Sequence, residues 1–183
     1  MTKITINALA ILFLLASCDS VSTDKIGKVK SEEKLVKEYC KNEGRSDKNF
    51  YRASASVTHP DLGASEYSAI IEAKALLAEN IKTAVKFVVD RHAETRTNSG
   101  LVNYTNLQEG ITRFTGEVDF SDVTLICTKV VRDKETGMYL RFVAIEMSKE
   151  EVANQIEAKI SKDDALYQDY KREKMRDILK EEF

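Results

Sequence analysis

The sequence predicts an α+β fold: a β-α-(α)-β-β core in which a long helix packs on a small, mainly antiparallel sheet, with C-terminal helices. Residues 64–95 carry apolar side chains three or four positions apart, which is the spacing of a helix with one buried face. Residues 123–132 and 138–147 are rich in β-branched and aromatic side chains and are joined by the short loop 133–137, as in a β-hairpin. Strands separated by helices, with one tight hairpin, favour a sheet that carries its helices on one face.

Two elements are predicted before the long helix. Residues 31–44 show a short helical pattern that begins at Ser31 and ends near Gly44. Residues 49–57 alternate in the period of two that is typical of a half-buried strand. Residues 59–63 (HPDLG) then supply a turn before the long helix.

Further helices are predicted on both sides of the hairpin. Residues 98–100 break the long helix, and apolar side chains at helical spacing predict a second helix over 101–118. After the hairpin, Ser148 and Glu151 match a capping box that begins a helix reaching residue 160. A last, charged helix is expected in residues 161–183.

The N-terminus has the layout of an export signal. Lys3 precedes an apolar run over residues 8–16, which is far shorter than the roughly 20 residues that a membrane-spanning helix needs. At its end, Leu15-Ala16-Ser17-Cys18 resembles the lipobox of bacterial lipoproteins, in which the cysteine is acylated and becomes the first residue of the mature chain. Cys18 is therefore the predicted lipidation site; the alternative is a plain secretory signal in which this cysteine is incidental.

Domain organisation follows from this signal and from the composition. Residues after Cys18 are polar and lack periodicity, as in a flexible tether. We expect a signal peptide (1–17), a lipidated tether (18–30), an α+β domain (31–160) and a charged amphipathic C-terminal helix (161–183).

Lipidation would place the protein in the cell envelope, facing the periplasm or the cell surface. Asp19 resembles the inner-membrane retention signal of some bacteria, but the outer membrane is the favoured location. The expected partners are the membrane, through the N-terminal lipid, and a second copy or another envelope protein. Acidic and basic residues nearly balance, at 30 and 28, so no nucleic-acid partner is expected.

Cys40 and Cys127 remain as an even pair once Cys18 is lipidated. In an exported chain they can form a disulfide, which would stabilise the fold by roughly 4 kcal/mol in the chain-entropy model. The alternative is two free thiols, buried or half-buried. Neither cysteine has a second cysteine or histidine at metal-ligand spacing nearby.

No catalytic constellation, metal site or cofactor motif is recognised. His59 and His92 are the only histidines and are not spaced as metal ligands, so a structural or solvent-facing role is expected for both. The paired acids 150–151 and 163–164 lie at predicted helix starts, where carboxylates stabilise the positive helix pole. A non-enzymatic binding or assembly module is the leading hypothesis. The alternative is an envelope hydrolase or glycan-modifying enzyme with a carboxylate site.

An apolar stripe runs along the otherwise charged C-terminal segment. It either packs on the parent domain or forms an exposed face for a partner or for self-assembly. The stripe comprises Leu166, Tyr167, Tyr170, Met175, Ile178 and Leu179.

The sequence also resembles a known family. An Ala-Ser-Ala-Ser strand (53–56), a Gly-Ala-Ser turn (63–65), an alanine-rich helix (73–81) and a distal strand (139–145) are similar to those of the small twenty-kilodalton bacterial lipoproteins. Relatives in that family include flagellar outer-membrane disk and ring lipoproteins. The resemblance implies a β-α-β-β core and an envelope location, but neither a reaction nor a substrate.

Overall fold

The computed structural model describes residues 38–94 and 101–181, with the side chains of 101–103 and 181 excepted. The described residues all belong to one unit, Lys37–Phe183. Its elements are β1 (Phe50–His59), α1 (Leu62–Glu94), α2 (Leu101–Thr115), β2 (Thr124–Arg132), β3 (Tyr139–Ser148), α3 (Lys149–Ile160), α4 (Asp164–Arg172) and α5 (Met175–Glu181). This arrangement confirms the predicted α+β fold.

The three strands form one antiparallel sheet in the order β1-β3-β2. β3 is therefore central, and β1 and β2 are the two edges. The β2–β3 ladder has a register shift between Leu125 and Cys127, where a bulge interrupts the pairing. From Cys127 to Arg132 the pairing is regular.

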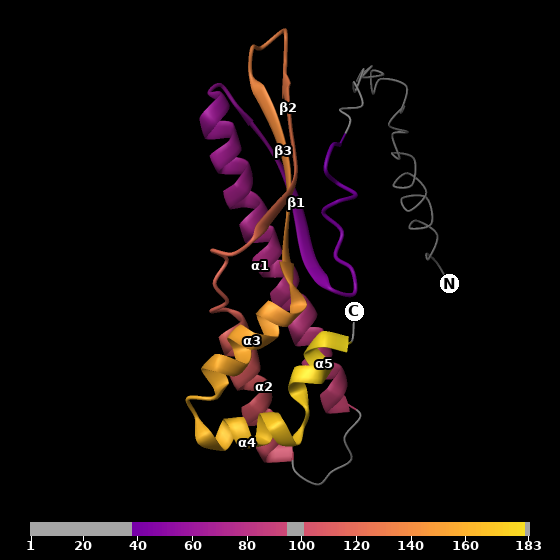
Figure 1. Ribbon diagram of the computed structural model, residues 1–183, viewed down its shortest axis with the longest axis vertical. Helices are drawn as coiled ribbons and strands as arrows, with labels where there is room; N and C mark the ends of the chain where they lie inside the picture. The colour runs from indigo at the N-terminus through magenta and orange to yellow at the C-terminus, as the bar shows by residue number, and fades with distance from the viewer. Residues whose placement is uncertain (1–37, 95–100, 182–183) are drawn as a thin grey trace, which may run out of the picture. The chain divides into compact units, whose positions relative to one another are not determined.

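α1 lies along one face of the sheet and continues past it into a group of helices, α2 to α5 (Figure 1). Its buried stripe advances mainly by four residues at a time, from Ala69 through Ala73 and Leu77 to Ile81 and Val85. Small side chains at the sheet end allow the helix to approach the strands closely, and larger ones fill the space between helices. α1 thus connects the sheet and the helical group through a single core.

The C-terminal segment contains two helices instead of the single one predicted. Asp163 caps α4, because its Oδ1 accepts from the backbone N–H of Leu166 at 3.1 Å. α4 ends at Arg172, and Lys174 adopts a left-handed conformation (φ 52°) before α5 begins. A left-handed residue cannot continue a right-handed helix, which explains the break. Both helices share the core of the domain, so residues 161–181 continue the domain.

The predicted helix over residues 31–44 is wrong for its described part. Residues 38–44 form turns, and Cys40 has a left-handed backbone (φ 61°) that a helix does not tolerate. The second helix ends at Thr115, before the predicted position 118, and Gly116 donates to Arg113 in a tighter closing turn. The capping role of Ser148 is confirmed, since its hydroxyl accepts from Glu151 N–H at 3.0 Å.

Candidate functional site

The predicted lipidation site lies outside the described residues. Cys18 and the segments 1–17 and 18–30 are therefore expectations from the sequence alone. Within 38–94 and 101–181, no helix combines the length and the apolar character needed to cross a bilayer. Even α1, with 33 residues, carries acidic and basic side chains on its exposed side.

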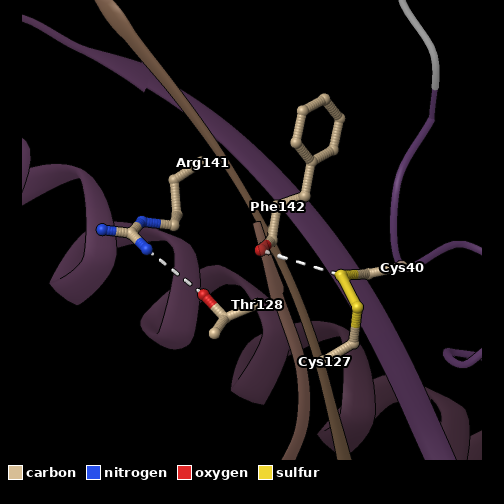
Figure 2. Close-up of a disulfide and its surroundings, with 5 residues drawn as sticks. All are labelled: Cys40, Cys127, Thr128, Arg141 and Phe142. Carbon is tan, nitrogen blue, oxygen red and sulfur yellow. Dashed lines mark hydrogen bonds between the residues drawn. A yellow bond between two sulfur atoms is a disulfide. The ribbon is translucent and has the colours of Figure 1, made fainter. Parts of the chain in front are cut away.

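A disulfide joins Cys40 to Cys127, with 5.6 Å between their Cα atoms. The sequence left open a disulfide or two free thiols, and the structure has the disulfide. It fastens the turn that begins the described chain to β2 (Figure 2). The sulfur of Cys40 also lies 3.9 Å from the carbonyl oxygen of Phe142. Because a disulfide sulfur carries no proton, this approach is a packing contact.

The disulfide belongs to a small apolar cluster on the sheet face opposite α1. Cys40, Phe142 and Ala144 are buried there, and the ring of Tyr39 meets that of Phe142 edge-on at 5.4 Å. The turn containing Cys40 therefore covers the middle of this face. Any segment that precedes residue 38 is joined to the domain beside this cluster.

Arg141 is a buried cation on the α1 side of the sheet, and it projects from β3 to the side opposite Phe142 (Figure 2). Its guanidinium donates to the Thr128 hydroxyl at 3.2 Å and lies 3.1 Å from the Glu66 carboxylate. It therefore links β3 with β2 and α1. This role was not predicted from the sequence, although a charge inside the apolar run of residues 139–147 is a usable signal.

The edge of the sheet at β1 is capped. The Ser46 hydroxyl accepts from the backbone N–H of Arg52 at 2.9 Å, and the Asn80 amide donates to the carbonyl oxygen of Arg52 at 3.1 Å. Gly44 lies so close to Ser54 that no side chain fits between them. Residues 44–47 and α1 therefore block the first half of this edge.

The opposite edge, β2, is open. Only Ile126 and Cys127 of its nine residues are half-buried, and the others are exposed. Val130 is 43% exposed and Val131 is 41% exposed. The apolar composition of residues 123–132 predicts a strand but not its exposure, for which Lys129 inside the run is the available signal. An open edge with apolar side chains is a surface on which another strand can pair.

The apolar stripe of the C-terminal segment is buried. Leu166, Tyr170, Met175 and Leu179 are at most 8% exposed, and Ile178 is half-buried against the same core. Packing on the domain, one of the two alternatives that the sequence left open, is thus the arrangement in the structure. These side chains present no exposed assembly face.

Both histidines make contacts that belong to the fold: His59 in a turn and His92 between helices. In the turn before α1, the backbone N–H of Asp61 donates to the ring Nδ1 of His59, at 3.0 Å between the two nitrogens. His92 Nε2 lies 3.6 Å from the buried carboxylate of Glu173, and its ring contacts Tyr104. Among the described residues, no three His, Cys, Asp or Glu side chains are grouped as metal ligands.

A cleft between α2 and α4 is lined by carboxylates and Arg113, the setting that a carboxylate enzyme would need. Asp163 caps α4 there, and Asp169 is paired with Arg172 at 2.9 Å. Two of its acids, Asp163 and Asp169, therefore stabilise the helix on which they lie. Glu109 lines the same cleft from α2.

A second hollow lies where β1 begins and β3 ends. It is lined by Lys48, Lys149, Glu150 and Lys180. The ammonium group of Lys149 is buried and lies 5.4 Å from the centre of the Tyr51 ring. Burial lowers the pKa of Lys149, and Glu150 pairs with Lys180 at 3.3 Å. These contacts attach α5 and the start of α3 to the sheet.

Comparisons with known proteins give no relatives: no family model matches the chain, and no curated protein or solved structure is detectably similar to it.

Proposed function

We propose that the protein is a lipid-anchored component of a bacterial cell envelope, held at the membrane through an acylated Cys18. The observation that carries this proposal is the apolar run of residues 8–16, which ends at Leu15-Ala16-Ser17-Cys18. Acyl chains contribute about 0.8 kcal/mol per buried methylene, so two or three of them give stable anchoring. The resemblance to the small twenty-kilodalton lipoproteins supports the same location.

The Cys40–Cys127 disulfide supports an exported protein. Disulfides persist in the periplasm and at cell surfaces and are rare in the reducing cytosol. The disulfide is also positioned to serve a tethered domain, because Cys40 lies near the point where residues 18–37 join the fold. Tension along such a tether would reach the sheet at β2 without first unfolding β1.

The folded part is proposed to act as a non-enzymatic binding or assembly module. In the clefts, Asp163 caps a helix, and Asp169 and Glu150 pair with neighbouring basic side chains. Its open β2 edge, in contrast, offers main-chain and apolar groups to another strand. A membrane tether and an open sheet edge are together suited to holding a partner near the bilayer.

Fatty-acid labelling tests the anchor. Cells producing the complete chain are grown with an alkyne-tagged fatty acid, and the membrane and soluble fractions are compared with those from a Cys18→Ala variant. The wild-type chain should carry the label and sediment with membranes. The variant should lose the label and keep the signal peptide, visible as a larger mass. Acylation of the Cys18→Ala chain would contradict the proposal.

A further inference from the structure

Alternate residues of β2 point their main-chain N–H and C=O groups toward the free edge, and the hydrogen bonds of the hairpin show which residues these are. Asp133 N–H donates to the carbonyl oxygen of Met138 at 2.8 Å, so these two residues form a hydrogen-bonded pair at the hairpin end. Along an antiparallel ladder, pairs that exchange hydrogen bonds alternate with pairs that do not. The main-chain groups of Thr128, Val130 and Arg132 therefore point away from β3, toward the free edge.

The pairing of β3 with β1 leads to the same assignment of outward-facing residues in β2. Lys149 N–H donates to Asn49 across the β1–β3 ladder at 2.9 Å, which directs the main chain of alternate residues, including Arg141, toward β1. Arg141 is the register partner of Val130. Val130 consequently has its N–H and C=O free on the outer edge, and within residues 38–94 and 101–181 no hydrogen bond to them is formed.

Two copies of β2 can pair about a two-fold axis centred on an inward-facing or on an outward-facing residue. Of the inward-facing centres, Lys129 places two ammonium groups opposite each other, and Val131 pairs Thr128 with Lys134, which lies beyond the strand. The outward-facing centres remain. A register centred on Arg132 places two guanidinium groups directly opposite each other. A register centred on Thr128 brings the bulge at Leu125–Cys127 into the ladder. Like charges opposite each other destabilise a ladder, and a bulge interrupts it. Both of these registers are therefore disfavoured.

The register centred on Val130 avoids both penalties. It pairs Val130 with Val130 of the second copy, Thr128 with Arg132, and Lys129 with Val131. No like charges lie directly opposite each other, and residues 128–132 are regular. It also covers Val130 and Val131, which are 43% and 41% exposed in the single chain.

We propose that β2 is a self-association edge. Two copies pair antiparallel through residues 128–132 about a two-fold axis at Val130, which joins two three-stranded sheets into one sheet of six strands. The interface is isologous and closes after two copies, as in most symmetric dimers. At the other side of the sheet, residues 44–47 and Asn80 block the first half of the β1 edge, which limits further growth there.

Such a pairing is weak between free molecules and stronger on a membrane. Five residues from each strand bury less than the roughly 1,200 Å² that stable complexes usually bury. Lipid anchors confine the copies to one surface and so raise their effective concentration. This last step rests on the proposed anchor, whereas the pairing geometry does not.

Cross-linking of the complete chain in its own membrane tests the pairing. Val131→Cys introduces one free thiol beside the proposed axis, since Cys40 and Cys127 are already bonded and an acylated Cys18 carries no free thiol. Ser56→Cys is the matched control, because Ser56 is an exposed residue of the other edge strand. A short bismaleimide should convert the Val131→Cys chain to a species of twice the mass and leave the Ser56→Cys chain monomeric.

Charged substitutions at position 130 test whether the strand paired with β2 is a second copy of β2. In the Val131→Cys background, Val130→Lys and Val130→Glu each place like charges opposite each other and should abolish the cross-link. Co-production of the two variants places lysine opposite glutamate and should restore it. Urea unfolding of each variant establishes that the chain is folded.

Membrane fractionation of the same samples separates the two proposals. A membrane-bound Val131→Cys chain that gives no doubled species, or that cross-links only to a protein of another mass, overturns self-association and leaves the anchor proposal standing. A doubled species that forms in a soluble, unlabelled Val131→Cys chain and not in the matched Ser56→Cys chain, which also has Cys18, overturns the anchor and supports the pairing.

Discussion

Gly44 packs against Ser54 with no room for a side chain: a Cβ atom on Gly44 would lie 2.5 Å from the Cβ of Ser54 and 2.8 Å from its backbone nitrogen. The contact brings the turn of residues 38–47 onto β1, where Ser46 caps the strand edge. Since backbone is one of the atoms approached, the overlap cannot be relieved by rotating a side chain.

We therefore expect Gly44→Ala to destabilise the fold by about 1–3 kcal/mol, the usual cost of overpacking. Gly63→Ala is the control, because the nearest atom to its Cβ is the Asp61 carboxylate at 3.4 Å and Gly63 lies within α1. Replacement of a helical glycine should stabilise by about 0.5 kcal/mol. Urea unfolding of both variants measures the difference, and equal effects would show that the turn does not pack as described.

The Cys40–Cys127 disulfide spans 87 positions of sequence. In the chain-entropy model, closing such a loop contributes roughly 4–5 kcal/mol. The double variant Cys40→Ser/Cys127→Ser should lose about that amount in urea unfolding. The oxidised wild-type chain should fall to nearly the same stability when a reductant is added, whereas the double variant should not respond to it. A reductant effect on the double variant would point to another cause.

The hydroxyl of Tyr170 is buried, with the residue 1% exposed, and has no hydrogen-bond partner among residues 38–94 and 101–181. A buried polar group without a partner keeps its desolvation cost, commonly about 1–3 kcal/mol. Tyr170→Phe removes the hydroxyl and keeps the ring in the core, so it should leave stability unchanged or raise it by about 1 kcal/mol. Tyr170→Ala, which leaves a cavity, should cost about 3–5 kcal/mol. Marked destabilisation by Tyr170→Phe would reveal a partner for the hydroxyl.

Much of the fold could be predicted because local patterns and final packing agree. The spacing of apolar residues in α1 is the spacing of its buried stripe, and the hairpin sequence has the two strands that pair. The break at Lys174 could not be predicted, since it depends on one left-handed residue with no glycine to mark it. The exposure of β2 could not be predicted either, because apolar strands at the edge and at the centre of a sheet have similar sequences.

The location of the proposed self-association edge at β2 could not be predicted from the sequence either. Cys40 and Cys127 were identifiable as a pair, but only the fold shows that their disulfide lies beside the open edge. The apolar stripe of the C-terminal segment looked available for assembly and instead completes the core. Sequence periodicity identifies apolar side chains that should be buried. Only the tertiary structure shows which of them are buried within the domain and which stay exposed.

Two buried tyrosines should make the fold sensitive to alkali. Burial raises the pKa of Tyr51 from 10.0 to about 12. Burial, and secondarily the nearby Glu157 carboxylate, raises the pKa of Tyr170 as well. Above pH 10 the unfolded chain releases phenolic protons that the folded chain retains, so stability falls as pH rises.

For each tyrosine the loss is about 1.4 kcal/mol per pH unit while pH lies between its two pKa values. Urea unfolding at pH 11, 11.5 and 12 should show a steady decline in stability. Below the ordinary lysine pKa of 10.5, Lys149 acts in the opposite sense, because burial lowers its pKa in the fold and loss of its proton favours the folded state. Tyr51→Phe should reduce the slope of that decline. A slope identical to that of the wild-type chain would indicate that Tyr51 ionises normally in the fold.

Lys174 occupies the position after the α4 C-cap with φ 52°, where helices usually place glycine. A left-handed backbone costs a residue with a Cβ roughly 1–2 kcal/mol, and glycine avoids that cost but loses more entropy on folding. Lys174→Gly should therefore stabilise the protein by about 0.5–1 kcal/mol in urea unfolding. Lys174→Ala is the control for the loss of the charged side chain, and it should give no gain because alanine keeps the Cβ. If both variants stabilised equally, the lysine charge and not the backbone conformation would be the source of strain at the α4–α5 junction.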